Sequence, residues 1–260
     1  MQESLAVDPV DLQFYKPHYQ FQIETEKYHL KIANHFHQLN ELFRFRQQVF
    51  HGDQGNKLLD FDVFDSHCDH ILVIDKQTNS ICGTYRLALS NKVSSHYSQT
   101  EFELDQFLAL PGVKMELGRA AISAHHRNGQ VLDLLWRGLA EYAKLSKADF
   151  LFGCSSVMTT NKRDTLQIFK DLQSKNHLVF EYGIQPTLKY QFDFENPQRE
   201  SMGTHFSEIP PLLLSYLNAG SKVYGHPALD KDFGCIDFLT ILDLKNLTRF
   251  YKKRYFRDAT

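Results

Sequence analysis

The sequence is poor in features that mark several large classes of protein. Its 260 residues include 4 cysteines and 1 tryptophan, and no stretch approaches the roughly 20 consecutive apolar residues of a membrane span. The cysteines, at positions 68, 82, 154 and 235, form no C-x-x-C pair and no Cys/His cluster with zinc spacing. We therefore expect reduced thiols, no metal site and a cytoplasmic protein.

A large excess of charge of either sign is also missing. Lys and Arg total 29 against 31 Asp and Glu, and the formal net charge of -2 argues against nucleic-acid binding through bulk charge. With 42% hydrophobic and 23% charged residues, the composition is that of an ordinary globular protein. Residues 1–20 are acidic and interrupted by proline, so we expect a loose arm there and no signal peptide.

The clearest local pattern lies between residues 115 and 157. A strand over 115–123 precedes a polar turn, a helix with apolar residues at helical spacing and a second strand over 150–157. This order predicts two parallel strands joined by a crossover helix. The turn would direct backbone N–H groups and a positive helix end at one spot, which suits a phosphate, but an ordinary turn explains the residues equally well. The turn carries His125, His126, Arg127, Asn128 and Gly129.

The other segments predict a single α/β domain over residues 1–260. Strands are expected at 28–33 (a sheet edge), 70–75, 81–89, 183–195 and 236–242. Helices are expected at 34–50, 162–174 and 210–220, the last with Pro at its start and Gly at its end. The strand pair around Asn79 predicts an antiparallel hairpin. Residues 90–112 form a connection, and residues 245–260 predict a C-terminal basic and aromatic helix.

Four motifs in the central stretch resemble the GNAT superfamily of N-acyltransferases. They are ELGR at 116–119, RNG at 127–129, LLWRG at 134–138 and LFGCSS at 151–156. More narrowly, they are similar to the hemolysin-like branch that makes long-chain N-acyl amino acids, which includes ornithine–acyl-carrier-protein N-acyltransferases and is related to acyl-homoserine-lactone synthases. The resemblance extends over residues 28–242, through a PPLL helix at 210–213 and a P-A-x-D-x-D-F turn at 227–233. It implies a GNAT fold, with a mixed central sheet flanked by helices and a C-terminal extension.

The resemblance also implies a set of site residues. The lactone synthases share an Arg/Phe pair, two Asp, a further Arg and a Glu/Arg pair, which match Arg46, Phe50, Asp62, Asp65, Arg86, Glu116 and Arg119. The arginines would hold a loop and the substrate carboxylate, and the acids would face the amine. Among these residues the catalytic set is expected to be Glu116, Arg119 and Asp65, with Glu116 as the base, directly or through water. The other four are expected to bind substrate. A tryptophan that the lactone synthases carry after the first helix is missing, which argues against lactone synthesis.

Strand geometry bears on the Glu/Arg pair. Glu116 and Arg119 are three residues apart, so a regular strand places them on opposite faces and a bulge is needed to bring them together. GNAT proteins typically carry such a bulge, and it aims a backbone N–H at the thioester carbonyl. The alternative is a surface ion pair that contributes little. A metal site at His70 has weak support, because the matching family motif binds no metal.

The polar turn bears on the donor. Acetyl-CoA enzymes usually carry R/Q-x-x-G-x-G/A, whereas here the last position is Val131. The phosphopantetheine of an acyl carrier protein has one phosphodiester, so Arg127, Asn128 and Gly129 would suffice to bind it. Arg137, Lys144 and Lys147 would either meet an acidic carrier protein or form a solvated helix face. Acyl-phosphopantetheine is thus the expected cosubstrate, with no bound cofactor.

Together these patterns predict transfer of a long-chain fatty acyl group from acyl carrier protein to the α-amine of an amino acid, with ornithine leading by resemblance. The alternatives are an acetyl-CoA-dependent N-acetyltransferase and a non-catalytic module that binds acyl carrier protein. The C-terminal helix, with Leu247, Phe250, Tyr251 and Tyr255 on one stripe among basic residues, predicts either packing on the sheet or weak contact with the inner membrane surface.

Overall fold

The computed structural model describes residues 12–52, 59–195 and 209–256. The chain packs as two compact units, each built from separated segments. The first unit contains residues up to 94 together with 115–148, and the second contains residues 95–114 and those from 149 onward. The expectation of a single domain stays a prediction.

The strands of the first unit form an antiparallel sheet in sequence order. They are β1 (Gln22–Glu24), β2 (Tyr28–Ile32), β3 (Asp69–Asp75), β4 (Ser80–Leu89) and β5 (Val113–Ile122), whose residues from 115 onward belong here. The predicted hairpin is confirmed as β3 and β4. The prediction that residues 28–33 form a sheet edge is wrong, because β1 pairs with the outer side of β2. Three residues are too short for a strand pattern to be recognised in the sequence.

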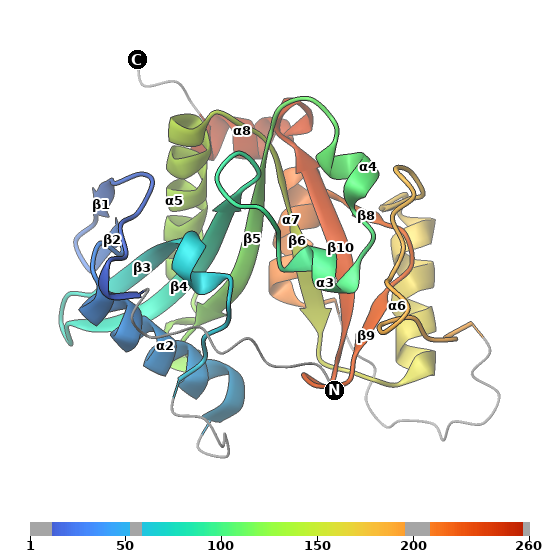
Figure 1. The fold of residues 1–260 in the computed structure, drawn as a ribbon, viewed down its shortest axis with the longest axis horizontal. Coiled ribbons are helices and arrows are strands. Elements are labelled where there is room, and N and C mark those ends of the chain that lie inside the picture. Colours follow the sequence, from blue (N-terminus) through green and yellow to red (C-terminus); the bar gives the residue numbers. More distant parts are fainter. Residues whose placement is uncertain (1–11, 53–58, 196–208, 257–260) are drawn as a thin grey trace. The chain divides into compact units, whose positions relative to one another are not determined.

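Two helices cover the two faces of this sheet (Figure 1). Adjacent strand residues point to opposite faces. Ile71 faces α5 (Gln130–Ser146), where its side chain lies close to Gly138. Leu72 faces α2 (Phe36–His51) and packs in one apolar cluster with Leu39, Leu42 and Phe43. In β3, His70 and Leu72 therefore point at α2, and a register shift beyond Val73 interrupts the alternation in the pair with β4.

The segment before β1 is packed against the first unit. Leu12 and Tyr15 are buried. The buried carboxylate of Asp69 accepts hydrogen bonds from the backbone N–H groups of His18 and Tyr19 and from the Tyr142 hydroxyl. The prediction of a loose arm is wrong for residues 12–20, since two apolar anchors and a buried acceptor hold a segment of otherwise polar composition. Residues 1–11 lie outside the described residues.

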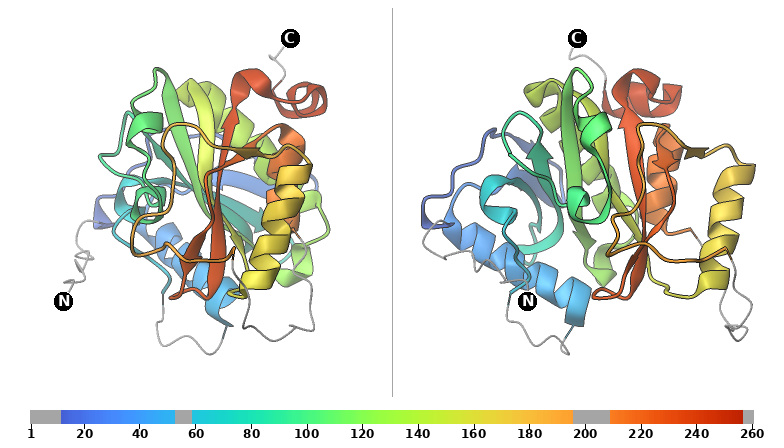
Figure 2. Two further views of the ribbon diagram at one scale, coloured as in Figure 1. Left: turned by 90° about the vertical axis from the view of Figure 1, so that its right-hand side faces the viewer. Right: turned by 45° about the vertical axis from the view of Figure 1, so that its right-hand side comes forward.

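The second unit is organised around one long strand. β10 (Cys235–Asp243) pairs antiparallel with β6 (Ala148–Val157), β8 (Lys222–Tyr224) and β9 (Ala228–Asp230), and β8 pairs parallel with β7 (Leu178–Val179). Helices α6 (Lys162–Ser174) and α7 (Pro211–Ala219) pack their apolar faces on β10, beside which they lie in Figure 2. Parallel and antiparallel pairs in one sheet confirm the predicted mixed sheet.

The connection at 90–112 contains two single-turn helices, α3 (Ser98–Glu101) and α4 (Asp105–Leu108). Short 3₁₀ turns lie at η2 (Asp65–His67), η3 (Ala124–His126) and η4 (Leu244–Asn246). The predicted strand at 183–195 is wrong. Tyr182 and Gly183 take positive φ angles of 58° and 62°, and Pro186 has no N–H to donate to a ladder, so the segment turns instead of extending.

Within the range 245–260 the structure has a short helix, α8 (Arg249–Tyr255), and residues 257–260 lie outside the described part of the chain. None of its residues is buried. Among the helices that the structure describes, none combines the length and the apolar character needed to cross a membrane.

Candidate active site

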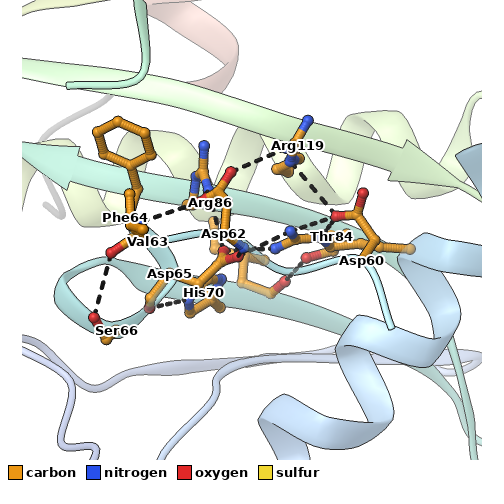
Figure 3. Close-up of polar contacts among 12 residues, drawn as sticks. Asp60, Asp62, Val63, Phe64, Asp65, Ser66, His70, Thr84, Arg86 and Arg119 are labelled. Carbon is orange, nitrogen blue, oxygen red and sulfur yellow. Dashed lines mark hydrogen bonds and ion pairs between the residues drawn. The ribbon is translucent and has the colours of Figure 1, made fainter. Parts of the chain in front are cut away.

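Three aspartates and three arginines meet on the α2 face of the first unit (Figure 3). Arg86 in β4 is the cross-strand partner of His70 in β3, and both point to this face. Arg46 comes from α2, Arg119 comes from β5, and the aspartates come from residues 60–65. The structure thus brings together Arg46, Asp62, Asp65, Arg86 and Arg119, which the sequence singled out from four separate segments.

Arg46 is the buried centre of the network. Its guanidinium donates to Asp60 Oδ1 from Nε at 2.7 Å, and to Asp65 from Nη1 at 2.7 Å and Nη2 at 3.1 Å. Arg46 and Asp65 are at most 1% exposed, so these bonds are shielded from water. Paired, hydrogen-bonded charges of this kind are costly to break, because the loss of one partner leaves the other charge buried and unpaired. Arg46 therefore holds the aspartate segment on α2.

Asp62 connects the two remaining arginines. Its Oδ1 accepts from Arg86 Nη1 at 2.6 Å, and its Oδ2 accepts from Arg119 Nη2 at 2.9 Å. Arg86 also donates to Asp65 at 3.2 Å. Asp62 and Arg119 are the outer members of the network, with 22% and 14% of their side chains exposed, against 6% or less for the other four. These two can meet a solute without rearrangement of the rest.

Charge pairing controls ionisation in the network. Burial by itself raises the pKa of Asp65, but the adjacent Arg46 and Arg86 outweigh burial and lower that pKa far below its usual value. Asp60 behaves likewise: burial opposes ionisation, and the charges of Arg46 and Arg119 hold its pKa below the ordinary value. Both carboxylates are therefore charged at neutral pH and are poor proton acceptors.

His70 supports the backbone of the segment that carries Asp65. It is fully buried, and its Nε2 lies 3.0 Å from the Asp65 carbonyl oxygen. Burial is the main cause that lowers its pKa, so the ring is neutral at physiological pH. A neutral ring donates its Nε2 proton to that carbonyl. His70 thus fixes the backbone of η2, and nothing in its contacts favours a metal role.

A bulge in β5 brings the Glu116 and Arg119 pair to one face. Gly118 pairs with Arg86 and Ala121 pairs with Thr84, so two residues of β5 oppose Tyr85 alone. Arg119 takes a φ of 48° within this bulge. Its side chain reaches the same Asp62 carboxylate as Arg86, while Glu116 lies opposite Ala88 and therefore on the same face as Arg86. Glu116 is 4% exposed.

Other expected site residues lie further from this network or at the surface. Phe50 is half-buried near the end of α2, one turn beyond Arg46, with its ring beside His51. In the polar turn, Arg127 donates to the Ile122 carbonyl at 3.1 Å, and Asn128 Oδ1 accepts from the Gln130 N–H at 3.1 Å. Gly129 takes a φ of 85° at the start of α5. All three turn residues are exposed, as are Arg137, Lys144 and Lys147.

Two features were missed in the sequence. Asp60 completes the network but belongs to a polar loop without a local pattern. His126 holds the base of the exposed turn, with Nδ1 2.7 Å from Ser123 Oγ and Nε2 2.9 Å from Asp75 Oδ2. Histidine and aspartate far apart in sequence give no signal of such a pair. This link fixes the turn to the end of β3.

Comparison with known proteins finds one matching domain family and several similar sequences. Residues 43–137, which contain all six residues of the network, match the family described as acetyltransferase (GNAT) domain. The L-ornithine N(alpha)-acyltransferase of Rhizobium meliloti (strain 1021) is 28% identical over 219 residues, covering 80% of this chain and 74% of the relative. The protein of the same name from Agrobacterium fabrum (strain C58 / ATCC 33970) is 28% identical over 226 residues, covering 77% and 72%.

Among solved structures, the CoA-dependent acyl-homoserine lactone synthase MesI aligns with a TM-score of 0.47 and 12% identity, covering 86% of this chain and 90% of that one. The sequence relatives and the domain match agree with each other. Residues 43–137 match the acetyltransferase (GNAT) domain family, and the chain is similar over most of its length to proteins named L-ornithine N(alpha)-acyltransferase.

Proposed function

We propose that this protein transfers a long-chain fatty acyl group from acyl carrier protein to the α-amine of ornithine. The observation that carries the proposal is the joint arrangement of the bulged β5, Glu116 and the Asp62–Arg119 pair in a chain related to L-ornithine N(alpha)-acyltransferases. An amino acid presents an ammonium and a carboxylate close together. Asp62 and Arg119, the outer members of the network, offer the two complementary charges.

The reaction needs few groups. The neutral amine attacks the thioester carbonyl, the C–N bond forms, and the C–S bond breaks as the pantetheine thiolate leaves. A backbone N–H at the β5 bulge is our candidate to stabilise the carbonyl oxygen as it becomes anionic. Glu116 receives the amine proton, directly or through water, and no covalent enzyme intermediate is required.

The α-amine is the proposed acceptor because its pKa is lower than that of the side-chain amine. An α-amine has a pKa of about 8, so a usable fraction is neutral near pH 7, whereas a lysine-like side-chain amine, with a pKa of about 10.4, is almost entirely protonated. Burial and ion pairing make Asp65 and Arg46 positioning residues in this scheme, together with Asp60 and Arg86. Arg127, Asn128 and Gly129 would hold the single phosphodiester of the donor at the start of α5.

A direct assay tests the proposal. The full-length protein is incubated with long-chain acyl carrier protein or acetyl-CoA and with an equimolar mixture of amino acids. We expect mass spectrometry to find N-acyl ornithine as the main product, with fragmentation placing the acyl group on the α-nitrogen. A clear preference for acetyl-CoA would contradict the donor, acylation of another amino acid would contradict the acceptor, and absence of any acylated product would contradict the activity.

A further inference from the structure

A second group of reactive side chains is buried in the second unit, under the turn that joins β9 to β10. Asp230 ends β9, Cys235 begins β10 directly opposite it, and Asp237 follows on the same face of β10. One ligand atom from each of the three lies within 4.8 Å of the others, and the Cys235 thiol is 3.3 Å from Asp237 Oδ2. Each residue is at most 3% exposed.

An independent observation points into the same place. Glu101, at the end of α3, is 0% exposed, and neither of its carboxylate oxygens has a hydrogen bond of good geometry among the described residues, although the Tyr97 hydroxyl and the Cys154 thiol lie near. Asp237 and then Asp230 are the charged groups that most strongly raise the pKa of its carboxyl group, and Asp237 lies within hydrogen-bond reach of it, so this group faces the cluster. In the described parts of the chain, no Lys, Arg or His forms an ion pair with any of these three acids. Buried charges are normally paired or bound to metal.

The acids are held in a way that leaves ligand atoms available. Asp237 Oδ1 accepts from the Ser156 hydroxyl at 2.6 Å, and Asp230 Oδ1 accepts from the N–H groups of Asp232 and Phe233 at 2.9 and 3.0 Å. Oδ1 of each aspartate is thus fixed by a donor, and Oδ2 of Asp237 accepts from the Cys235 thiol, whose proton would leave when a metal ion binds. Such supporting hydrogen bonds orient the ligands of protein metal sites.

We propose that Asp230, Cys235, Asp237 and Glu101 bind one divalent metal ion, with zinc as the best match. One thiolate and three carboxylate oxygens give zinc four ligands of types that it accepts, and a thiol ligand disfavours magnesium and calcium. Cys235 loses its proton to solvent when the ion binds. The ion would join α3 to the β9–β10 hairpin. Residues 231, 232 and 234 of the turn above the cluster are exposed, so solvent is close.

This site departs from the expectation of no metal, and the sequence explains why. Zinc spacing is recognised by paired Cys and His residues, whereas this cluster contains one Cys and no His. Its fourth member lies more than a hundred residues upstream of the others. The proposal is independent of the acyltransferase activity, because it concerns the ligands and stability of the second unit.

Metal binding to the full-length protein tests the proposal. After chelator treatment and dialysis, the protein is titrated with zinc, and bound metal and melting temperature are measured. We expect one zinc per chain and a higher melting temperature for the wild type. Cys235→Ser and Asp237→Asn should weaken binding at least about tenfold, the lower end of effects at metal sites. Cys82→Ser is the control, since Cys82 is buried but its thiol donates to the Val73 carbonyl.

Cobalt substitution gives a readout that does not need the variants to fold. Cobalt bound through Cys235 should give the thiolate-to-metal charge-transfer absorption in the wild type. No stoichiometric metal and no change in melting temperature in the wild type would overturn the proposal, and the cluster would then be held by shared protons. Equal zinc affinity in wild type and a folded Cys235→Ser variant would also overturn it, because the metal would then be bound elsewhere.

Discussion

Glu116 shows how a single residue depends on the strand around it. Its acidic side chain shares a face with Arg86 through regular strand pairing, and the bulge that follows in β5 brings Arg119 to that face. Glu116→Gln keeps the size of the side chain but removes its ability to accept a proton. We expect folding and donor binding to be preserved and turnover with ornithine to fall by roughly 10²–10⁴, the usual scale of general acid–base catalysis.

Single-turnover measurements with purified variants check this expectation. Glu103→Gln, which changes an exposed glutamate in the connection before β5, is the matched control and should behave as the wild type. A folded Glu116→Gln protein with near-normal turnover would remove Glu116 as the base.

His70 makes stability depend on pH. Burial lowers its folded-state pKa, so in mild acid the unfolded chain binds a proton that the folded chain does not. The stabilisation from a neutral His70 is therefore complete above the unfolded pKa of about 6.5 and is lost as pH falls below it. We expect urea unfolding to show lower stability at pH 5 than at pH 7.5, with a smaller difference in His70→Gln.

His37→Gln is the control for the unfolding experiment with His70→Gln, because the side chain of His37 is 78% exposed. An unchanged pH dependence in His70→Gln would show that another group causes the loss. At still lower pH, Asp60 and Asp65 also contribute, since their pKa values are lowered in the fold and stability is lost as they protonate.

The sequence identified most residues of the arginine–aspartate network but not all of them. Five of the six network residues were identified, because the resemblance covers them as a set. Asp60 was missed because a charged residue in a polar loop looks like any other until its partner is known. The face on which Arg119 lies depends on a left-handed φ of 48°, which an arginine rarely adopts. The adjacent residues in the sequence do not predict this conformation.

At the scale of elements, those with local signals were predicted well. Helix α6 was bounded correctly because Asn161 caps it and its apolar residues recur at helical spacing. The two-residue β7 was missed and the strand at 183–195 was predicted wrongly. Apolar and β-favouring residues there pack into the core of the second unit and form an isolated bridge between Pro186 and Phe102 in place of a strand. Tertiary context decides this outcome.

The contact between α5 and β4 is tight enough to test. A Cβ added at Gly83 would lie 2.6 Å from Cγ1 of the buried Val131, in the first turn of α5. Because a β-branched side chain has little freedom to move away, Gly83→Ala should destabilise the protein by about 1–3 kcal/mol. Val131→Ala in the same chain should recover part of this loss. Urea unfolding of the two single variants and the double variant measures the coupling, and strictly additive effects would contradict it.

Helix α8 carries the residues for which membrane contact is predicted. Phe250 is 63% exposed, and Arg249, Lys252, Lys253 and Arg254 surround it. An exposed aromatic ring among cations suits the surface of an anionic bilayer. We expect the full chain to float with anionic vesicles at low salt and less so at moderate salt, and a truncation after Leu244 to float less. Phe250→Ser should fall between them. Equal flotation of the full and truncated chains would leave packing as the role of α8.

At the scale of the whole molecule, net charge does not explain recognition of an acidic carrier protein. The formal charge of -2 would repel such a partner weakly, so attraction must come from a local group of cations such as Arg127. Arg127→Glu should weaken use of acyl carrier protein mainly through slower association, with a defect that shrinks as salt rises.

Arg163→Glu, at an exposed position of α6, changes the formal net charge equally, from -2 to -4. Association rates with acyl carrier protein, measured across a salt series, separate the two variants. Equal defects in both would assign the effect to total charge and contradict a carrier-protein site at the turn.

The bulge in β5 also limits how this chain can vary in length. Removing Ala120, one of the two residues that oppose Tyr85, would restore regular alternation. Ala121 would still pair with Thr84, but Arg119 alone would oppose Tyr85 and would point to the other face. Arg119 would leave Asp62, and the network would keep three acids with two bases. A deletion of one residue here is therefore more damaging than most substitutions. Families built on this strand should tolerate insertions and deletions in their loops but keep the spacing between Glu116 and Ala121 constant.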